Sequence, residues 1–163
     1  MPLHTSFEGY ALLDDSPINR LSKHLHPYLC STVYAVTKTS AFLNNISCHV
    51  DDKIENLFFE ITYEISSAFQ GKSKVINTLS WLRSNENTAH YINDRESGKR
   101  KREIFQIILE SEHELDPIIL KIAKHLHKLN SNYSEKILVE ILRSVLRAYA
   151  YPVSYTHLTL PTT

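Results

Sequence analysis

Two stretches of the chain carry apolar residues at the spacing of a single helix face, and they constrain the fold more than any other feature. The first runs from about Asp52 to Gln70, and the second follows Ser134. In both, apolar residues recur every three or four positions, which matches a helix of 3.6 residues per turn. Such stripes must be buried, so they predict helices packed against one another. Their members are Ile54, Leu57, Phe58, Ile61, Ile65 and Ala68, then Ile137, Leu138, Ile141, Leu142, Val145, Leu146 and Tyr149.

Prolines and the polar residues before them predict where further helices begin and end. Ser16 precedes Pro17, which predicts a short helix that Pro27 interrupts. Asp116 precedes Pro117 in the same way, so a later helix is expected to open there. Together with the two stripes, these signals predict up to seven helices. The first starts at residue 17, and the next two cover about 28–47 and 52–70. A fourth runs from 73 into the polar run 84–87, and the last three cover 99–113, 117 to about 129, and 134 onwards.

Glycine is scarce, and its positions predict breaks between helices. Gly71 follows the first stripe, where a left-handed glycine would close the helix, and Ser73 would then cap the next one. With only 3 glycines and 6 prolines in 163 residues, the chain lacks the turns that a many-stranded protein needs. It also has no glycine-rich phosphate loop and no alternation of strands with helices. We therefore predict an all-α fold, an irregular bundle of six or seven helices.

The last eleven residues differ abruptly from the charged helix before them. The segment 153–163 has no charged residue. Over ten consecutive residues, Val153 to Thr162, it resembles the translation of a transposase adapter used to prepare sequencing libraries. The resemblance implies that 153–163 is not native and that the natural chain is C-terminally truncated near Pro152. Residues 16–152 are then expected to form one helical domain, incomplete at its C-terminus, behind an N-terminal segment 1–15.

Charge and cysteine content bear on the compartment. Lys plus Arg and Asp plus Glu number 18 each, so no net field draws the chain towards nucleic acid or an anionic membrane. No apolar run is long enough to cross a bilayer, and the first fifteen residues lack a signal-like pattern. Cys30 and Cys48 are too few for a disulfide framework and fit two buried thiols in a reducing compartment. These features predict a cytoplasmic protein without membrane contact.

Two histidine pairs raise the question of a metal site. His24 and His26, like His125 and His127, stand two positions apart. On a helix this spacing turns the two side chains about 200° from one another, so they cannot bind one ion. We therefore expect solvated or partly exposed histidines beside a core leucine.

A Glu-x-x-His motif and the two cysteines are the other candidates for metal ligation. Glu110 and His113 have the spacing found in di-iron carboxylate bundles, but those bundles repeat the motif on a second helix and add glutamates from two others. Cys30, Cys48 and His49 lack the fourth ligand and the paired short spacings of a zinc site. The sequence therefore predicts neither a metal nor a cofactor.

One run of basic residues stands out, formed by Lys99, Arg100, Lys101 and Arg102. Between residues 95 and 103 there are five basic and two acidic residues. At the start of a helix, cations oppose the helix dipole, so the run is unfavourable for stability there. It is either a partner surface that neutralises phosphates or a solvated loop, and both interpretations stay open at this point.

Arg83 and His90 carry the one resemblance to an enzyme family. Six residues separate them, and this spacing resembles the Arg-x(4 to 6)-His signature of HEPN ribonucleases. The resemblance implies a helical, dimeric, metal-independent endoribonuclease, in which the histidine and arginine serve the attacking ribose hydroxyl and the developing phosphorane charge. The family favours Asn or Asp after the arginine, whereas this chain has Ser84.

Taken together, these patterns specify helices and caps far better than they specify chemistry. No nucleophile with a neighbouring base stands out along the chain. We therefore interpret it as a cytoplasmic helical interaction module, not an enzyme, that binds a protein or an anionic partner such as nucleic acid, with homo-oligomerisation left open. The alternative hypothesis is a HEPN-like endoribonuclease that uses Arg83 and His90.

Overall fold

The computed structural model describes residues 10–26, 35–51, 58–75 and 104–158, with the backbone alone at 48, 49, 51 and 151–158. Within these ranges the chain forms an irregular bundle of six helices, which confirms the all-α prediction. Its sole β pairing there is one antiparallel bridge between Leu12 and Ser73. The helices are α1 (Pro17–Leu25), α2 (Thr39–Asp51), α3 (Phe59–Gln70), a helix of residues 104–110, α5 (Glu112–Leu129) and α6 (Glu135–Leu158).

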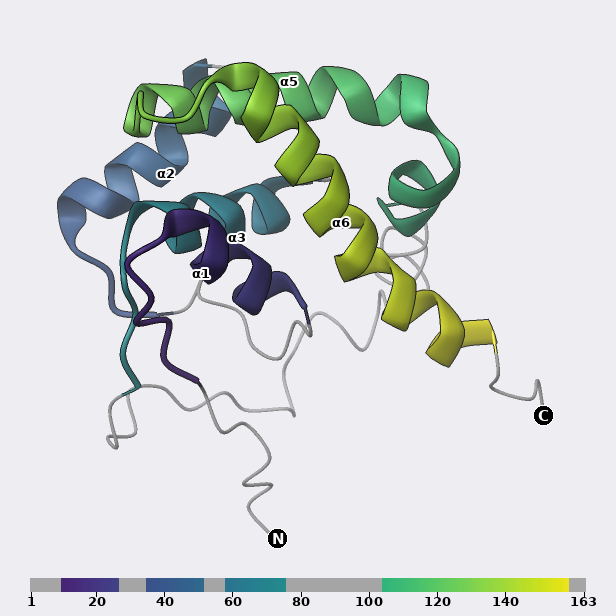
Figure 1. Cartoon of the computed structure of the whole chain (residues 1–163), viewed down its shortest axis with the longest axis horizontal. Coiled ribbons are helices and arrows are strands. Elements are labelled where there is room, and N and C mark those ends of the chain that lie inside the picture. The colour runs from purple at the N-terminus through teal and green to yellow at the C-terminus, as the bar shows by residue number, and fades with distance from the viewer. Residues whose placement is uncertain (1–9, 27–34, 52–57, 76–103, 159–163) are drawn as a thin grey trace, which may run out of the picture.

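The long helices α5 and α6 form a helical hairpin, with α5 along the top of the bundle and α6 descending obliquely from its end (Figure 1). α3 lies beneath this hairpin and packs against α1, α2 and α5. α1 also packs against α6, whereas α2 lies at the edge of the bundle against α3 and α5. Among the described residues, no helix combines the length and apolar character that crossing a bilayer requires.

The core lies where α1, α3, α5 and α6 meet, and it contains most of the two predicted stripes. Phe58, Ile61, Ile65 and Ala68 are buried, which confirms the described part of the first stripe. In the second stripe Ile137 is exposed, against expectation, because its side chain lies beyond the arc that faces α5. The members of that stripe that are buried are Leu138, Leu142, Val145 and Leu146.

Leu142 tests this core, because its side chain is fully buried on the inner face of α6. Replacing it by alanine should lower the free energy of unfolding by about 2 to 5 kcal/mol, the range for deleting buried aliphatic groups. The matched control is Ile137→Ala on the same helix, which should change it by about 0.5 kcal/mol or less. Urea denaturation of both variants measures the difference, and equal losses would show that the buried face of α6 is wrongly assigned.

Local signals placed the starts of α1 and α6 correctly. The Ser16 side chain accepts a hydrogen bond from the Asn19 N–H at 3.3 Å, with Pro17 as the first helical residue. Ser134 acts in the same way at α6, where its hydroxyl oxygen accepts from the Ile137 N–H at 3.4 Å. The backbone of α6 continues through Pro152 to Leu158. The interpretation of 153–163 as an adapter translation stays a prediction.

The start of α5 was predicted wrongly. The helix begins at Glu112 and contains Pro117, which was expected to open it. Two acidic residues in its first turn, Glu112 and Glu114, favour the earlier start because they lie at the positive end of the helix dipole. Pro117 removes only the hydrogen bond to the carbonyl of His113, and that residue is exposed to water.

The connection after α3 also differs from prediction. Gly71 is extended, with φ −157° and ψ 170°, and is not left-handed. The backbone after α3 is extended because Ser73 pairs with Leu12 through two backbone hydrogen bonds of 3.0 Å. Ser73 therefore belongs to a bridge, and residues 73–75 are not helical.

Two helices begin later than predicted. In the segment predicted to be helical over 28–47, residues 35–38 are not helical and α2 starts at Thr39. The β-branched Val36 and Thr37 disfavour a helix there. α3 begins at Phe59, although a helix was expected from Asp52. The expected start at Asp52 lies outside the described residues.

Candidate functional site

A buried arginine fixes the relative position of α1 and α3. Arg20 lies on the inner face of α1 and is almost fully buried. Its Nε and Nη2 atoms donate to the carbonyls of Ala68 and Phe69, at 2.9 and 2.7 Å. These are two of the last four carbonyls of α3, which have no partner within their own helix. The guanidinium therefore caps α3 and neutralises the negative end of its dipole.

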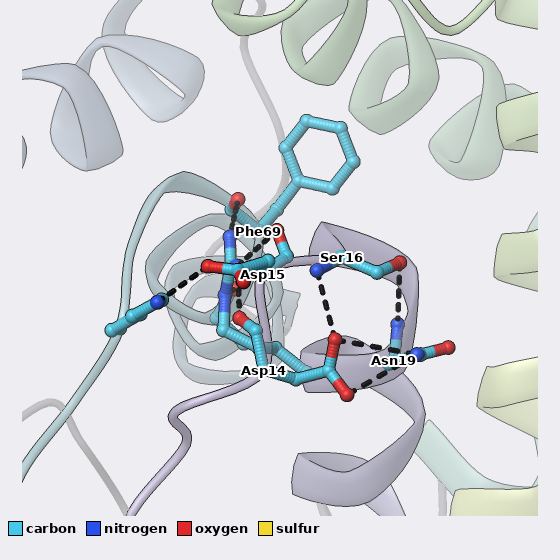
Figure 2. A network of polar contacts seen from close by, with 8 residues as sticks. Asp14, Asp15, Ser16, Asn19 and Phe69 are labelled. Carbon is cyan, nitrogen blue, oxygen red and sulfur yellow. Dashed lines mark hydrogen bonds and ion pairs between the residues drawn. The ribbon is translucent and has the colours of Figure 1, made fainter.

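The same guanidinium also holds the chain that leads into α1. Its Nη1 atom donates to the carbonyls of Asp14 and Asp15, at 2.7 and 3.0 Å. Figure 2 shows that the Asp14 carboxylate in turn accepts from the Ser16 N–H, at 2.8 Å, and from the Asn19 amide. Arg20 and Asp14 together order the turn that starts α1.

An open pocket of about 630 Å³ adjoins this junction. Its lining includes Arg20 and Phe69, together with Asn130 and Tyr133 from the loop between α5 and α6. The Phe69 and Tyr133 rings meet edge to face, with centroids 5.7 Å apart. The pocket lies within the size range of small-ligand sites, although its lining is more polar than is usual for them.

The charged groups at the pocket are already paired within the protein. Lys72 Nζ lies 2.5 Å from the Asp15 carboxylate, and both side chains are well exposed. The hydrogen bond and the charge of Lys72 hold the pKa of Asp15 below its usual range. The Arg20 guanidinium donates hydrogen bonds to four backbone carbonyls. The described residues that line the pocket can offer hydrogen bonds to a ligand, but none of them is a nucleophile beside a base.

Carboxamides connect α2 to the end of α3 beside the pocket. Asn45 is fully buried on α2, and its Nδ2 donates to the Ser67 hydroxyl oxygen at 2.7 Å. The Gln70 side chain donates to Asn45 Oδ1. Its Oε1 accepts from Asn44 Nδ2 at 3.2 Å. The inner face of α2 is therefore attached through polar contacts as well as through packing.

A second buried network joins the N-terminal segment to α1 and α3. His24 and Glu64 are both fully buried, with Nε2 and Oε2 2.7 Å apart. Tyr10 Oη donates to the His24 carbonyl at 2.9 Å and lies 2.8 Å from His24 Nδ1. With the Tyr10 proton on that carbonyl, Nδ1 must donate to Oη. Nε2 forms a hydrogen bond with the Glu64 carboxyl group, so both nitrogens of the buried imidazole have a partner.

Tyr149 of α6 interacts electrostatically with the same network. Burial raises the pKa of Tyr149 to about 12, and the negative charges of Glu60 and Glu64 act in the same direction. The phenol therefore stays protonated under physiological conditions. Because the folded-state pKa exceeds the usual value of 10.0, this group's contribution to stability is lost only as the pH rises from about 10 to 12.

The outer side of α2 presents apolar side chains to solvent. Leu43 and Val50 are 60% and 69% exposed, and Phe42 is 42% exposed. Together with the half-buried Ile46, these residues lie within about 100° of one another around the helix, since successive residues differ by 100°. We call Phe42, Leu43, Ile46 and Val50 the α2 flank. Phe42 lies at its inner border, where its ring meets Tyr63 at 6.2 Å.

The residues predicted to form functional sites all lie outside the described part of the chain. Arg83 and His90 fall in the segment 76–103, as do the four basic residues Lys99, Arg100, Lys101 and Arg102. Both hypotheses built on them, the ribonuclease site and the phosphate-binding surface, stay predictions. Cys30 also lies outside, and the side chains of Cys48 and His49 are not described.

The histidines were predicted wrongly in part. His26 is exposed, but His24 and His125 are buried, so they are not solvated as expected. His24 is buried because Glu64 and Tyr10 bind both of its ring nitrogens. His113 is exposed beyond the end of the helix that carries Glu110. In the described ranges, no group of three or more His, Cys, Asp or Glu side chains is arranged to hold a metal ion.

Arg20, Glu64 and Asn45 were not predicted as paired buried groups, although the sequence carries a signal for the first two. Glu64 interrupts the apolar stripe between Ile61 and Ile65, so a carboxylate is expected on a buried face and needs a partner. Arg20 likewise shares the face of α1 that carries Leu21. Comparisons of this chain with known protein families, curated proteins and solved structures found no match.

Proposed function

We propose that the chain is a cytoplasmic helical interaction module that binds another protein through the α2 flank. The observation that carries this proposal is the reversed polarity of α2. A helix at the edge of a bundle normally buries its apolar side chains and exposes its polar ones. In α2 the amide of Asn45 is fully buried, whereas Leu43 and Val50 face solvent. A protein partner would cover these apolar side chains.

The spacing of the flank fits a helical partner. Leu43, Ile46 and Val50 follow the i, i+3, i+7 pattern by which one helix contacts another. Leu43 and Val50 are two turns apart, which corresponds to about 10 Å along the axis. The contact would therefore be an elongated strip that suits a helix lying along α2.

Other exposed apolar residues are dispersed over the molecule. Leu13, Leu120 and Ile137 are exposed, but each belongs to a different element. Single exposed apolar residues are common in monomeric proteins and need no partner. On α2 several occur on one side of one helix, which distinguishes the flank from this background. This concentration of apolar side chains supports a protein as the partner of the flank.

Photo-crosslinking from the flank tests the proposal. We would replace Leu43 by benzoylphenylalanine and irradiate the protein in an extract of cells that produce it. A discrete adduct is expected because Leu43 would be buried in the complex. Adding Val50→Lys to the same protein should reduce the adduct by at least about tenfold, since a buried unpaired charge costs several kcal/mol.

The matched control carries the crosslinker at Leu120, an exposed apolar residue of α5 with 48% exposure. Position 120 should yield no adduct in common with position 43. Identical adducts at both positions would indicate non-specific contact and would contradict the proposal, as would an adduct at 43 that Val50→Lys leaves unchanged.

A further inference from the structure

We infer that the partner on the α2 flank is α2 of a second copy of this chain, packed antiparallel about a twofold axis at Ile46. The inference rests on the proposed function, and it names the occupant of the same surface. It follows from the position of the flank along the helix, from its charge and from its polar border.

The flank is self-complementary in position. It extends from Phe42 to Val50, so its centre at Ile46 nearly coincides with the middle of α2 (Thr39–Asp51). A twofold axis at Ile46 would place Phe42 of one copy opposite Val50 of the other and overlap the two helices along almost their full length. Contacts of this isologous kind are the commonest way in which identical chains associate.

The charges of the chain permit this pairing and favour its antiparallel sense. The side chains of α2 described as exposed are Thr39, Ser40, Phe42, Leu43, Asn44 and Val50, none of which is charged. Lys38, just before the helix, is exposed and would lie near the negative C-terminal end of the partner's α2. The full chain has a formal net charge of zero, so no overall repulsion keeps two copies apart.

The flank also has the polar border that interfaces commonly show. Ser40, Asn44 and Ser47 follow one another along one edge of it, at the i, i+4, i+7 spacing. Their side chains are small, which lets two helices approach closely. A contact limited to one helix from each copy is smaller than a standard interface of about 800 Å² per partner. We therefore expect a reversible equilibrium between monomer and dimer.

Sedimentation equilibrium of the purified full chain tests the inference. The wild type should shift from monomer to dimer as its concentration rises. Leu43→Lys and Val50→Lys should each weaken the association at least about tenfold, since each change appears twice in a twofold interface. Leu120→Lys adds the same charge at an exposed apolar position of α5, outside the flank, and should leave the association unchanged.

A mixing experiment tests the antiparallel register. Phe42→Glu and Val50→Lys should each prevent self-association, but an equimolar mixture should form heterodimers. In the mixed pair one contact joins the new glutamate to the new lysine, and the other keeps Phe42 against Val50. Circular dichroism of each variant would show that the helices remain folded, because Phe42 also packs on Tyr63.

The remaining outcomes separate this inference from the proposed function. A wild type that stays monomeric at all concentrations overturns the inference, but an adduct from Leu43 to a different protein would then still support the interaction module. A dimer that Leu120→Lys disrupts and Val50→Lys does not would place the self-interface elsewhere and overturn the inference, whereas the crosslinking from Leu43 would still decide the proposed function. Failure of the mixture to dimerise would overturn the antiparallel pairing.

Discussion

Replacing Arg20 by methionine is expected to lower the free energy of unfolding by about 3 to 5 kcal/mol, because the backbone carbonyls bound by the buried guanidinium would lose their charge-assisted hydrogen bonds. Methionine keeps the apolar stem of the side chain but removes the five N–H donors of the guanidinium. The carbonyls of Ala68 and Phe69 at the end of α3 would then lose their partner. Hydrogen bonds to a charged donor contribute about 1.5 to 3 kcal/mol each, so the loss should be large.

Arg20→Lys should give an intermediate loss. A lysine keeps the positive charge at the end of α3, but its single ammonium cannot reach carbonyls on both sides as the planar guanidinium does. The control is Arg143→Ala, which removes an exposed arginine whose Nη2 lies 2.9 Å from Asp116, and it should change stability by about 1 kcal/mol or less. If urea denaturation gave Arg20→Met and Arg143→Ala the same small loss, Arg20 would not be a cap of α3.

The sequence predicts α6 well because its signals are local. Ser134 caps the helix within its own first turn, and the stripe through Leu138 and Leu142 follows from helix periodicity alone. Neither signal depends on distant residues. The same holds for Ser16 and Pro17 at the start of α1.

The features that the sequence did not predict depend on contacts between distant residues. Asn45 is buried because Ser67 and Gln70, on another helix, bind its amide. Gly71 is extended because Ser73 pairs with Leu12, which is far away in the chain. No local pattern contains these pairings, so helix propensity and periodicity did not predict the buried amide of Asn45 and gave Gly71 the wrong conformation.

In the candidate site, too, local features are predictable from the sequence and contacts between distant residues are not. Arg20 and Glu64 occupy buried faces that the apolar pattern outlines, so a reader of the sequence can suspect that each is paired. Their partners are different in kind. Arg20 binds backbone carbonyls, which every residue has, whereas Glu64 binds the imidazole of His24. The packing of α1 on α3 decides which groups contact each other. The spacing of residues along the sequence does not contain this information.

The His24 and Glu64 pair gives the second large expected effect. Replacing Glu64 by leucine should lower the free energy of unfolding by about 3 to 5 kcal/mol, because one partner of a buried pair is removed and the other stays buried. His24 would retain its contacts with Tyr10 but would lose the carboxylate at Nε2. Glu64→Gln should cost less, since its amide still offers a hydrogen bond to the imidazole.

The exposed pair of His113 and Glu114 is the matched control. It joins the same two residue types at 3.5 Å but lies in solvent, so Glu114→Leu should cost only about 1 kcal/mol or less, from the lost charge at the start of α5. If Glu64→Leu and Glu114→Leu lowered the free energy of unfolding equally, burial would not be the reason that Glu64 stabilises the fold.

The double variant His24→Leu with Glu64→Leu decides whether the pair acts as a unit. Two apolar residues leave no buried charge, and such replacements are often neutral or stabilising where they pack well. Tyr10 would keep the bond from its hydroxyl to the backbone carbonyl of residue 24. We therefore expect the double variant to be more stable than Glu64→Leu alone, with a coupling energy of about 1 to 3 kcal/mol in a double-mutant cycle. Additive losses measured by urea denaturation would mean that His24 and Glu64 stabilise the fold independently of each other.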